Sequence, residues 1–293
     1  MTSTYRLLWL DLTRSCQLHC DHCYNDSGSD GTHGAMSREQ WLGVLDQAAE
    51  HGLTHVQFIG GEPTMHPDFP EFVDHALGLG LDVEVFSNLV HVSERCWELF
   101  RRERLSLATS YYSHRPDEHD AVTRRASHRR TRANIARAVS LGVPLRVGVI
   151  GADAQRVEAA REDLRTLGVT RIGTDRVRPF GRAAAGHAPD PSGLCGDCGN
   201  GKAAIGPDGT VSPCVFSTFM DVGNVMVSRL ADILSGVPMA EARAAVQGAA
   251  ARGRGCYPDQ APCGPDSAPP QPCAPDDHEC TPGHPGTECS PRS

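Results

Sequence analysis

Apolar residues recur with two different periods along the first 180 residues of the chain. Short runs rich in Leu, Val and Ile predict strands, at residues 7–12, 55–59, 82–86, 106–110, 145–150 and 171–177. Between these runs, apolar residues at helical spacing predict helices, at residues 37–51, 70–77, 93–102, 131–141 and 154–167. Strands that alternate with helices favour a parallel sheet with right-handed crossovers. We therefore predict an α/β fold, a partial (β/α)6 barrel with its chemistry at the carboxyl ends of the strands.

The pattern changes after residue 185. Residues 190–255 contain a predicted β-hairpin with its turn at residues 207–209, followed by an Ala-rich helix near residues 229–250. In the last 38 residues, ten prolines accompany five cysteines, each of which begins a Cys-x-Pro triplet. So few large apolar residues cannot form a packed core. We predict a barrel at residues 1–185, a small cysteine-rich extension at 190–255 and a largely disordered tail at 256–293.

Composition and charge restrict the possible partners and the compartment. The net charge of −8 disfavours broad electrostatic binding to nucleic acid. No apolar run is long enough to span a membrane, and no secretory signal opens the sequence. We therefore expect a cytoplasmic protein, with no nucleic-acid or membrane partner. Disulfides are rare in that compartment, so the twelve cysteines are expected to bind metals or clusters.

Three cysteines follow the first predicted strand within a single loop. Cys16, Cys20 and Cys23 have the spacing C-x3-C-x2-C. Three thiolates can bind three irons of a four-iron, four-sulfur cluster and leave the fourth iron open to a ligand. Zinc is the alternative, with His19 or His22 as the fourth ligand. A redox pair formed by Cys20 and Cys23 would leave Cys16 unexplained.

The segment after the second predicted strand lies at the same edge of the predicted sheet. It reads Gly60, Gly61, Glu62 and Pro63. Two glycines allow the backbone to approach a ligand closely, and the carboxylate beside them can pair with an ammonium group. The alternative is a tight turn before the next helix.

The two motifs together resemble the radical S-adenosylmethionine (SAM) enzymes. The sequence "CQLHCDHCY" is similar to the cysteine loop of that family, and "GGEP" to its methionine-binding segment. The resemblance covers about residues 5–180. It implies a [4Fe-4S] cluster on Cys16, Cys20 and Cys23. It also implies a group of SAM-binding candidates: His22, Tyr24, Gly60, Gly61, Glu62, Ser87 and Asn88. The last two follow the third predicted strand, where a simple turn is the alternative.

The same resemblance implies a reaction. The cluster would pass one electron to bound SAM, which would yield methionine and a 5′-deoxyadenosyl radical. That radical would remove a hydrogen atom from a substrate carbon, while the protein binds and orients the reactants. A flavodoxin- or ferredoxin-type protein would supply the electron.

A second cysteine group flanks the predicted hairpin. Cys195, Cys198 and Cys214 resemble the auxiliary-cluster extensions called SPASM and twitch domains. The resemblance implies one auxiliary iron–sulfur cluster, with Cys256 as a further ligand and Cys263 as an additional candidate. Zinc is again the alternative.

The extension implies two classes of substrate. We favour a ribosomally synthesised peptide that is crosslinked, epimerised or oxidised. The alternative is a small sugar or aminocyclitol intermediate that is dehydrogenated or otherwise modified, and a further alternative is a metal-binding scaffold without turnover. Six residues precede the first predicted strand, so we expect any peptide leader to be captured elsewhere or by a separate leader-binding protein.

Two residues are weaker catalytic candidates. Cys96, in the predicted helix at residues 93–102, is expected to pack against the barrel, with donation of a hydrogen atom as the alternative. Tyr111 and its neighbour Tyr112 could line the pocket or fill the barrel.

Two arginine-rich segments have both a structural and a functional interpretation. The run at residues 124–132 could be a solvated helix start or could contact an acidic leader. His119 and Asp120 could cap the same helix. Arg176 or Arg178, after the last predicted strand, could bind a substrate carboxylate or pair with an internal acid.

Overall fold

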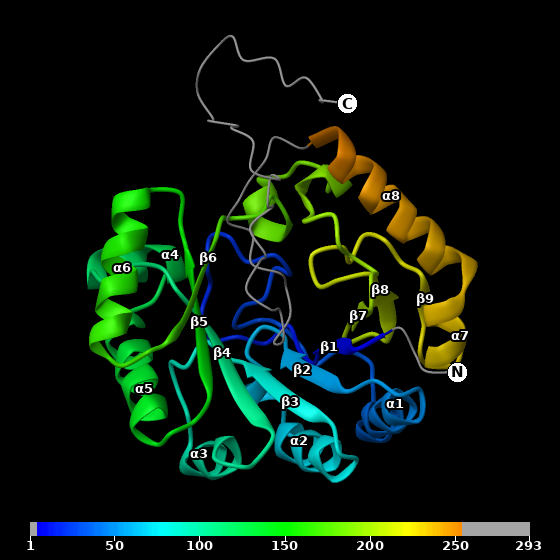
Figure 1. The fold of residues 1–293 in the computed structure, drawn as a ribbon, viewed down its shortest axis with the longest axis horizontal. Helices are drawn as coiled ribbons and strands as arrows, with labels where there is room; N and C mark the ends of the chain where they lie inside the picture. Colours follow the sequence, from blue (N-terminus) through cyan, green and yellow to red (C-terminus); the bar gives the residue numbers. More distant parts are fainter. Residues whose placement is uncertain (1–4, 254–293) are drawn as a thin grey trace, which may run out of the picture.

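A computed structural model describes residues 5–253 and confirms the predicted α/β fold. Six neighbouring strands run parallel and are hydrogen-bonded in chain order (Figure 1). They are β1 (Leu7–Asp11), β2 (His55–Ile59), β3 (Asp82–Phe86), β4 (Leu105–Tyr111), β5 (Leu145–Ile150) and β6 (Arg171–Asp175).

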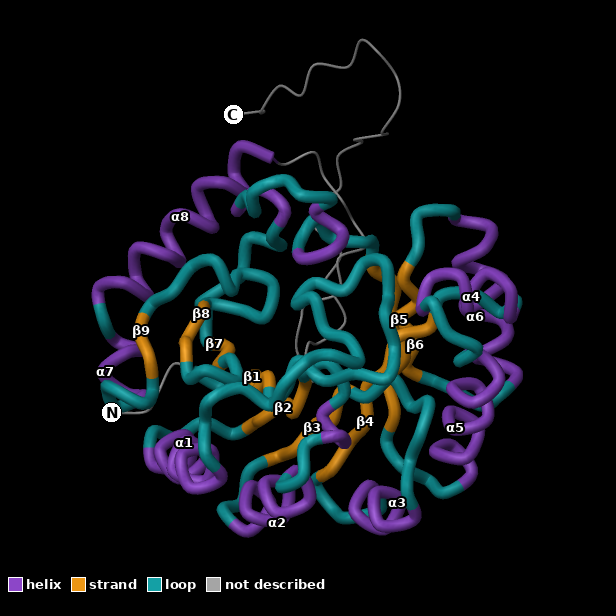
Figure 2. Tube along the Cα trace, turned by 180° about the vertical axis from the view of Figure 1, so that it is seen from behind, coloured by secondary structure: helices purple, strands orange, loops and turns teal. Residues whose placement is uncertain are grey.

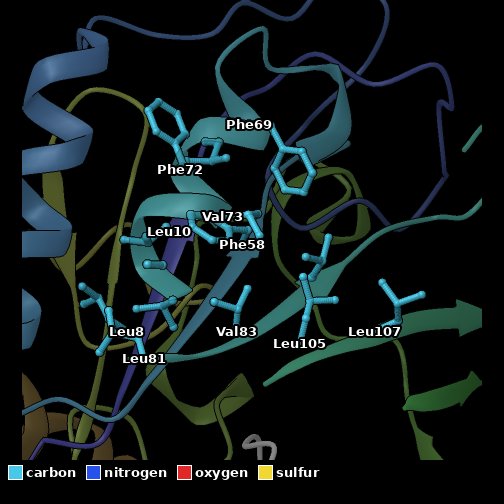
Figure 3. Packing of buried hydrophobic residues seen from close by; sticks show 14 of the residues in the cluster. Leu8, Leu10, Phe58, Phe69, Phe72, Val73, Leu81, Val83, Leu105 and Leu107 are labelled. Atoms are coloured by element: carbon cyan, nitrogen blue, oxygen red, sulfur yellow. The ribbon is translucent and has the colours of Figure 1, made fainter. Parts of the chain in front are cut away.

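Helices cover one face of this curved sheet (Figure 2). They are α1 (Arg38–Glu50), α2 (Phe69–Gly78), α3 (Glu94–Phe100), α4 (Pro116–Thr123), α5 (His128–Ser140) and α6 (Ala154–Thr166). Alternate residues of the strands point toward the helices, where Leu8, Phe58 and Val83 pack with Phe69 and Phe72 of α2 (Figure 3). The intervening strand residues face the interior of the partial barrel.

Helix α4 was not predicted, and α5 begins three residues before the predicted start. Arg124 ends α4 in the left-handed conformation, with φ of 56°. The carboxylate of Asp120 then accepts hydrogen bonds from the backbone nitrogens of Ser127 and His128, at 2.9 and 2.8 Å. Asp120 thus caps α5, as the sequence had suggested. Asp120 itself lies in α4, which was not predicted because its amphipathicity is weak.

The predicted hairpin is confirmed, and it extends the main sheet. Strands β7 (Lys202–Ile205) and β8 (Thr210–Ser212) pair antiparallel, and β9 (Gly223–Asn224) follows β8. Strand β7 also pairs parallel with β1, so the sheet has nine strands in the order β6-β5-β4-β3-β2-β1-β7-β8-β9. The division of the chain at residues 185–190 stays a prediction, because the sheet itself is continuous.

The predicted Ala-rich helix is two helices. Helix α7 (Leu230–Ser235) ends before Gly236, which is extended, and α8 (Val237–Gly253) begins directly after it. Pro238 lies in the first turn of α8, where proline is tolerated because its missing N–H would have no partner. Short 3-10 turns lie at η1 (Pro63–Met65), η2 (Gly181–Ala184) and η3 (Pro191–Gly193). No helix of the described residues has the length and apolar character needed to cross a membrane.

Candidate active site

The cysteine loop and the Gly-Gly-Glu segment touch along their backbones. Pairing of β1 with β2 continues beyond both strands, because Gly61 N donates to Thr13 O at 2.7 Å and Glu62 N to Ser15 O at 2.9 Å. A side chain on Gly60 would place its Cβ 2.8 Å from the carbonyl oxygen of Thr13, and one on Gly61 would overlap that of Ser15. The close approach that these glycines allow is therefore to the loop that carries the cysteines.

Glu62 is buried at the centre of this contact. Its Oε2 accepts a hydrogen bond from Asn88 N at 2.9 Å, and its Oε1 accepts from Thr64 N at 3.2 Å and Thr64 Oγ1 at 2.7 Å. A hydrogen bond with Ser87 adds to this set. Burial raises the pKa of the Glu62 carboxyl, and these donors oppose the shift. Glu62 therefore joins the ends of β2 and β3.

Asn88 extends the connection from Glu62 to the cysteine loop. Its Oδ1 accepts from Gln17 Nε2 at 3.0 Å, and its Nδ2 lies 3.6 Å from Cys16 Sγ as a donor. Its carbonyl oxygen accepts from Thr131 Oγ1 of α5 at 3.0 Å. The structure thus brings the predicted residues Cys16, Glu62 and Asn88 into one hydrogen-bonded group.

The three thiols of the loop are a donor set for iron. Cys16 is buried, and Cys20 and Cys23 are half-buried. Burial, followed by smaller contributions from neighbouring acidic groups, raises the pKa of Cys16 to about 12 and that of Cys20 to about 11. The pocket alone therefore does not favour thiolates, whereas a coordinated metal deprotonates thiols outright. This donor set fits iron, with each thiolate on a different iron of one cluster.

A single-ion site is less well supported. Among residues 5–253, no three His, Cys, Asp or Glu side chains converge on a point that would hold one metal ion. Zinc needs such convergence, whereas ligands of a four-iron cluster are spread around it. His22 instead stacks edge-on against Tyr112, with ring centroids 4.9 Å apart.

Arg182, which sequence reasoning had not assigned, and Tyr112, which it had offered as a pocket or barrel residue, contact the cysteine loop. Arg182 Nε donates to the carbonyl oxygen of Cys20 at 2.8 Å, and its Nη2 donates to that of Ser27 at 2.7 Å. Its backbone nitrogen donates to the carbonyl of Cys23 at 2.9 Å. The hydroxyl of Tyr112 shares a hydrogen bond with the Cys20 thiol. Arg182 lies in the same Arg-rich segment as Arg178, but the sequence gave no sign of its role.

The second cysteine group gathers beside the hairpin. The Cys198 thiol contacts those of Cys195 and Cys214, and these contacts raise the pKa of Cys198. The same three residues line a cavity. Its other lining residues include Trp9, Arg178, Lys202 and Phe216. Cys256, predicted as a further ligand, lies outside the described residues.

The remaining candidates lie elsewhere. Cys96 is buried in the core between the sheet and the helices, as is Tyr111. The Tyr111 hydroxyl donates to Asp163 Oδ2 at 2.8 Å and lies 2.8 Å from His128 Nε2. Both residues thus face the helices, not the cysteine loop. Arg176 is exposed.

Arg178 is buried and pairs with an acidic residue of the same chain. This pairing was one of the two roles that the sequence suggested, the other being to bind a substrate carboxylate. Its Nη2 lies 3.1 Å from Asp175 Oδ1, at the end of β6. Its guanidinium also lies over the ring of Phe216, 5.6 Å from the centroid, beside the second cysteine group. Arg178 therefore lines the same cavity as the second cysteine group.

Comparison with known proteins identifies the family. The profile of the radical SAM superfamily matches residues 10–164, and that of the iron–sulfur cluster-binding SPASM domain matches residues 195–259. The chain belongs to the radical SAM superfamily. Membership implies a [4Fe-4S] cluster and SAM, and the SPASM extension implies auxiliary iron–sulfur binding.

Curated relatives match part of the chain. A PqqA peptide cyclase of Streptomyces rochei is 34% identical over 143 residues, which are 48% of this chain and 39% of the relative. One from Xanthomonas campestris pv. campestris is 41% identical over 81 residues, or 28% of this chain and 20% of the relative. The chain thus spans well under half of the length of these relatives.

Solved structures share the fold over more of the chain. Streptococcus suis SuiB bound to its precursor peptide SuiA superposes with a TM-score of 0.69 at 14% identity, over 83% of this chain and 67% of SuiB. The protein anSMEcpe with bound SAM and a peptide gives a TM-score of 0.64 at 11% identity, over 80% and 81% of the two chains. At such identities the likeness concerns the fold alone.

Proposed function

We propose that this protein is a radical SAM enzyme that modifies a ribosomally synthesised peptide. The observation that carries the radical chemistry is the hydrogen-bonded group of Cys16, Asn88 and Glu62, which joins the cysteine loop to the ends of β2 and β3. When bound, the cluster and SAM supply a 5′-deoxyadenosyl radical that removes a hydrogen atom from a substrate carbon. A flavodoxin- or ferredoxin-type donor provides the electron.

The chain's own residues bind and orient these reactants. Cys16, Cys20 and Cys23 each hold one iron. Arg182 fixes the carbonyl groups of Cys20 and Cys23, and so would hold the thiols in position when a cluster is bound. Glu62 and Asn88 form one wall of the site. Gly60 and Gly61 directly precede Glu62 in the chain. In this proposal, those residues receive the methionine part of SAM, and Ser87 and Asn88 its ribose.

The second cysteine group gives the enzyme its auxiliary cluster in this proposal. Cys195, Cys198 and Cys214 would supply thiolates. Arg178 and Lys202 line the same cavity, where each is paired with an acid, Asp175 and Asp197. When bound, an auxiliary cluster would supply an acceptor for the electron left on the substrate, which would permit net oxidation.

A peptide substrate is supported by the relatives. A protein named as a PqqA peptide cyclase is 34% identical to this chain over 143 residues, and the superposed SuiB structure holds a precursor peptide. A separate leader-binding protein and cytoplasmic localisation belong to the same proposal.

Coexpression tests the substrate class. The gene is expressed with the short open reading frames encoded next to it, and each peptide is analysed by high-resolution mass spectrometry. A crosslink or oxidation lowers the peptide mass by a pair of hydrogens, and an epimerisation incorporates solvent deuterium. The matched control is the Cys16→Ala variant, in which no change is expected. Formation of 5′-deoxyadenosine with no modified peptide, but with oxidation of a cyclitol or sugar, would replace the peptide with a small molecule.

A further inference from the structure

Three exposed arginines form a basic patch at the start of α5. They are Arg125, Arg129 and Arg130. Within the described part of the chain none of them forms an ion pair, although their neighbours do: Arg124 pairs with Asp21 at 2.7 Å and Arg132 with Asp163 at 2.7 Å. The patch is therefore a surface of uncompensated positive charge on a chain whose net charge is −8.

Helix stability does not explain this patch. The backbone N–H groups at the start of a helix carry partial positive charge, so acidic residues stabilise the first turn and basic residues destabilise it. The first turn of α5 contains no acid, and Arg129 and Arg130 stand in it. The cap comes from Asp120, which is in α4. If this segment were only a solvated helix start, acidic residues would be more favourable than arginines in its first turn.

The patch follows, in the chain, the segment that holds the cysteine loop. The backbone nitrogens of His19 and Asp21 donate to the carbonyl oxygens of Thr123 and Val122, at 3.1 and 3.0 Å. These bonds flank Cys20. The Arg124–Asp21 ion pair fastens the same two segments together. The patch is thus joined, through Thr123 and Arg124, to the loop that carries the cluster ligands.

We propose that this basic patch is the docking surface for an acidic, low-potential electron-transfer protein that reduces the cluster. The inference rests on the proposed function, because only a redox cluster needs such a partner. One electron passes from the reduced partner to the cluster; the partner is oxidised by one electron, and no covalent bond forms or breaks. An acidic partner is repelled by the negatively charged chain as a whole and attracted at this patch, which orients the encounter.

Reversing the charge of the patch tests the proposal. The variant is Arg129→Glu with Arg130→Glu, and the probe is a purified acidic bacterial flavodoxin. The control, Arg95→Glu with Arg101→Glu, makes the same charge change at exposed arginines at the start and end of α3 that have no ion pair among the described residues. We expect the patch variant to associate with flavodoxin about tenfold more slowly at low salt, as measured by surface plasmon resonance. The difference should shrink as salt is raised.

The folded state should tolerate this variant, because new acids in the first turn of α5 suit the helix dipole. Its thermal unfolding should therefore be no lower than that of the unchanged protein. Equal association rates for the patch variant and the control would overturn the proposal. Loss of binding to a synthetic oligoglutamate peptide, with flavodoxin binding unchanged, would assign the patch to an acidic leader instead. Dithionite reduces the cluster without docking, so failure of the unchanged protein to cleave SAM with dithionite would contradict the proposed function and not the patch.

Discussion

The ring of Tyr24 packs against the ring of Phe216, with centroids 4.9 Å apart and the planes inclined by 56°. Tyr24 follows Cys23 in the chain, and Phe216 lies two residues after Cys214. This contact therefore joins the loop of the first cysteine group to that of the second. Both rings border an inner core that also contains Trp9, so the barrel and the extension share apolar packing as well as a sheet.

The first prediction concerns this shared packing. A double-mutant cycle with Tyr24→Leu and Phe216→Leu should give a coupling of about 0.5–1.5 kcal/mol in the free energy of unfolding, the usual range for an aromatic pair. Urea denaturation measures it. The control cycle pairs Phe216 with Phe100 of α3, which lies in a different core cluster, and should give additive effects. Additive effects in both cycles would show that the two parts are energetically independent.

The second prediction concerns Glu62. Glu62→Ala removes the acceptor of Asn88 N and of both Thr64 donors, so the free energy of unfolding should fall by about 1–3 kcal/mol. SAM affinity, measured by equilibrium dialysis, should fall in this variant and also in Glu62→Gln, which keeps one acceptor but no charge. Glu98→Ala, an exposed position in α3, is the control. A Glu62→Gln protein with full SAM affinity would rule out a role for the charge.

The third prediction concerns Tyr112. Its hydroxyl shares a hydrogen bond with the Cys20 thiol, and such bonds to sulfur ligands make reduction of a cluster easier. Tyr112→Phe keeps the ring against His22 but removes this bond, so the midpoint potential of the loop cluster should become more negative. A redox titration followed by electron paramagnetic resonance measures the shift. An unchanged potential, with the cluster intact, would mean that the hydroxyl serves packing alone.

The fourth prediction concerns acid stability. Burial, with a smaller contribution from His128, lowers the pKa of His119 from its ordinary value of 6.5 to about 4. The folded state therefore binds this proton less readily than the unfolded chain. The free energy of unfolding is therefore unaffected by protonation of His119 above pH 6.5. As the pH falls from 6.5 to about 4, it should decrease by up to about 3 kcal/mol.

Replacement of the imidazole checks this assignment. His119→Phe should make the free energy of unfolding less dependent on pH across that window, as measured by urea denaturation at a series of pH values. The control is His187→Phe, at an exposed position, which should leave the dependence as it is. An equally steep dependence in the His119 variant would assign the acid sensitivity to other groups.

The barrel could be predicted from the sequence because its strands and most helices carry strong periodic signals. Each β1 to β6 strand overlaps its predicted range. The cysteine and Gly-Gly-Glu motifs could be placed together because both follow neighbouring parallel strands. Helix α4 was missed because its eight residues are mostly polar and bury few side chains, among them His119 and Thr123.

Contacts between residues far apart in the chain could not be predicted from the sequence. Nothing in the residues of β7 indicates that they pair with β1 nearly two hundred positions earlier. The same holds for Arg182, whose bonds to the carbonyls of Cys20 and Ser27 follow from the path of the chain after β6. Gly60 and Gly61 were predicted to let a ligand approach the backbone closely. In the structure, the segment that approaches them is the cysteine loop. Spacing can locate such residues at one edge, but only packing decides what each one touches.

Cleavage of SAM is the most direct test of the central claim that Cys16, Cys20 and Cys23 hold a catalytic cluster. The full chain, reconstituted with iron and sulfide under anaerobic conditions and reduced with dithionite, is incubated with SAM, and 5′-deoxyadenosine is quantified by liquid chromatography with mass spectrometry. The unchanged protein should form 5′-deoxyadenosine. The variant with all three cysteines replaced by alanine should form none while retaining the circular dichroism spectrum of the folded protein. Formation of 5′-deoxyadenosine by that folded variant would contradict the account.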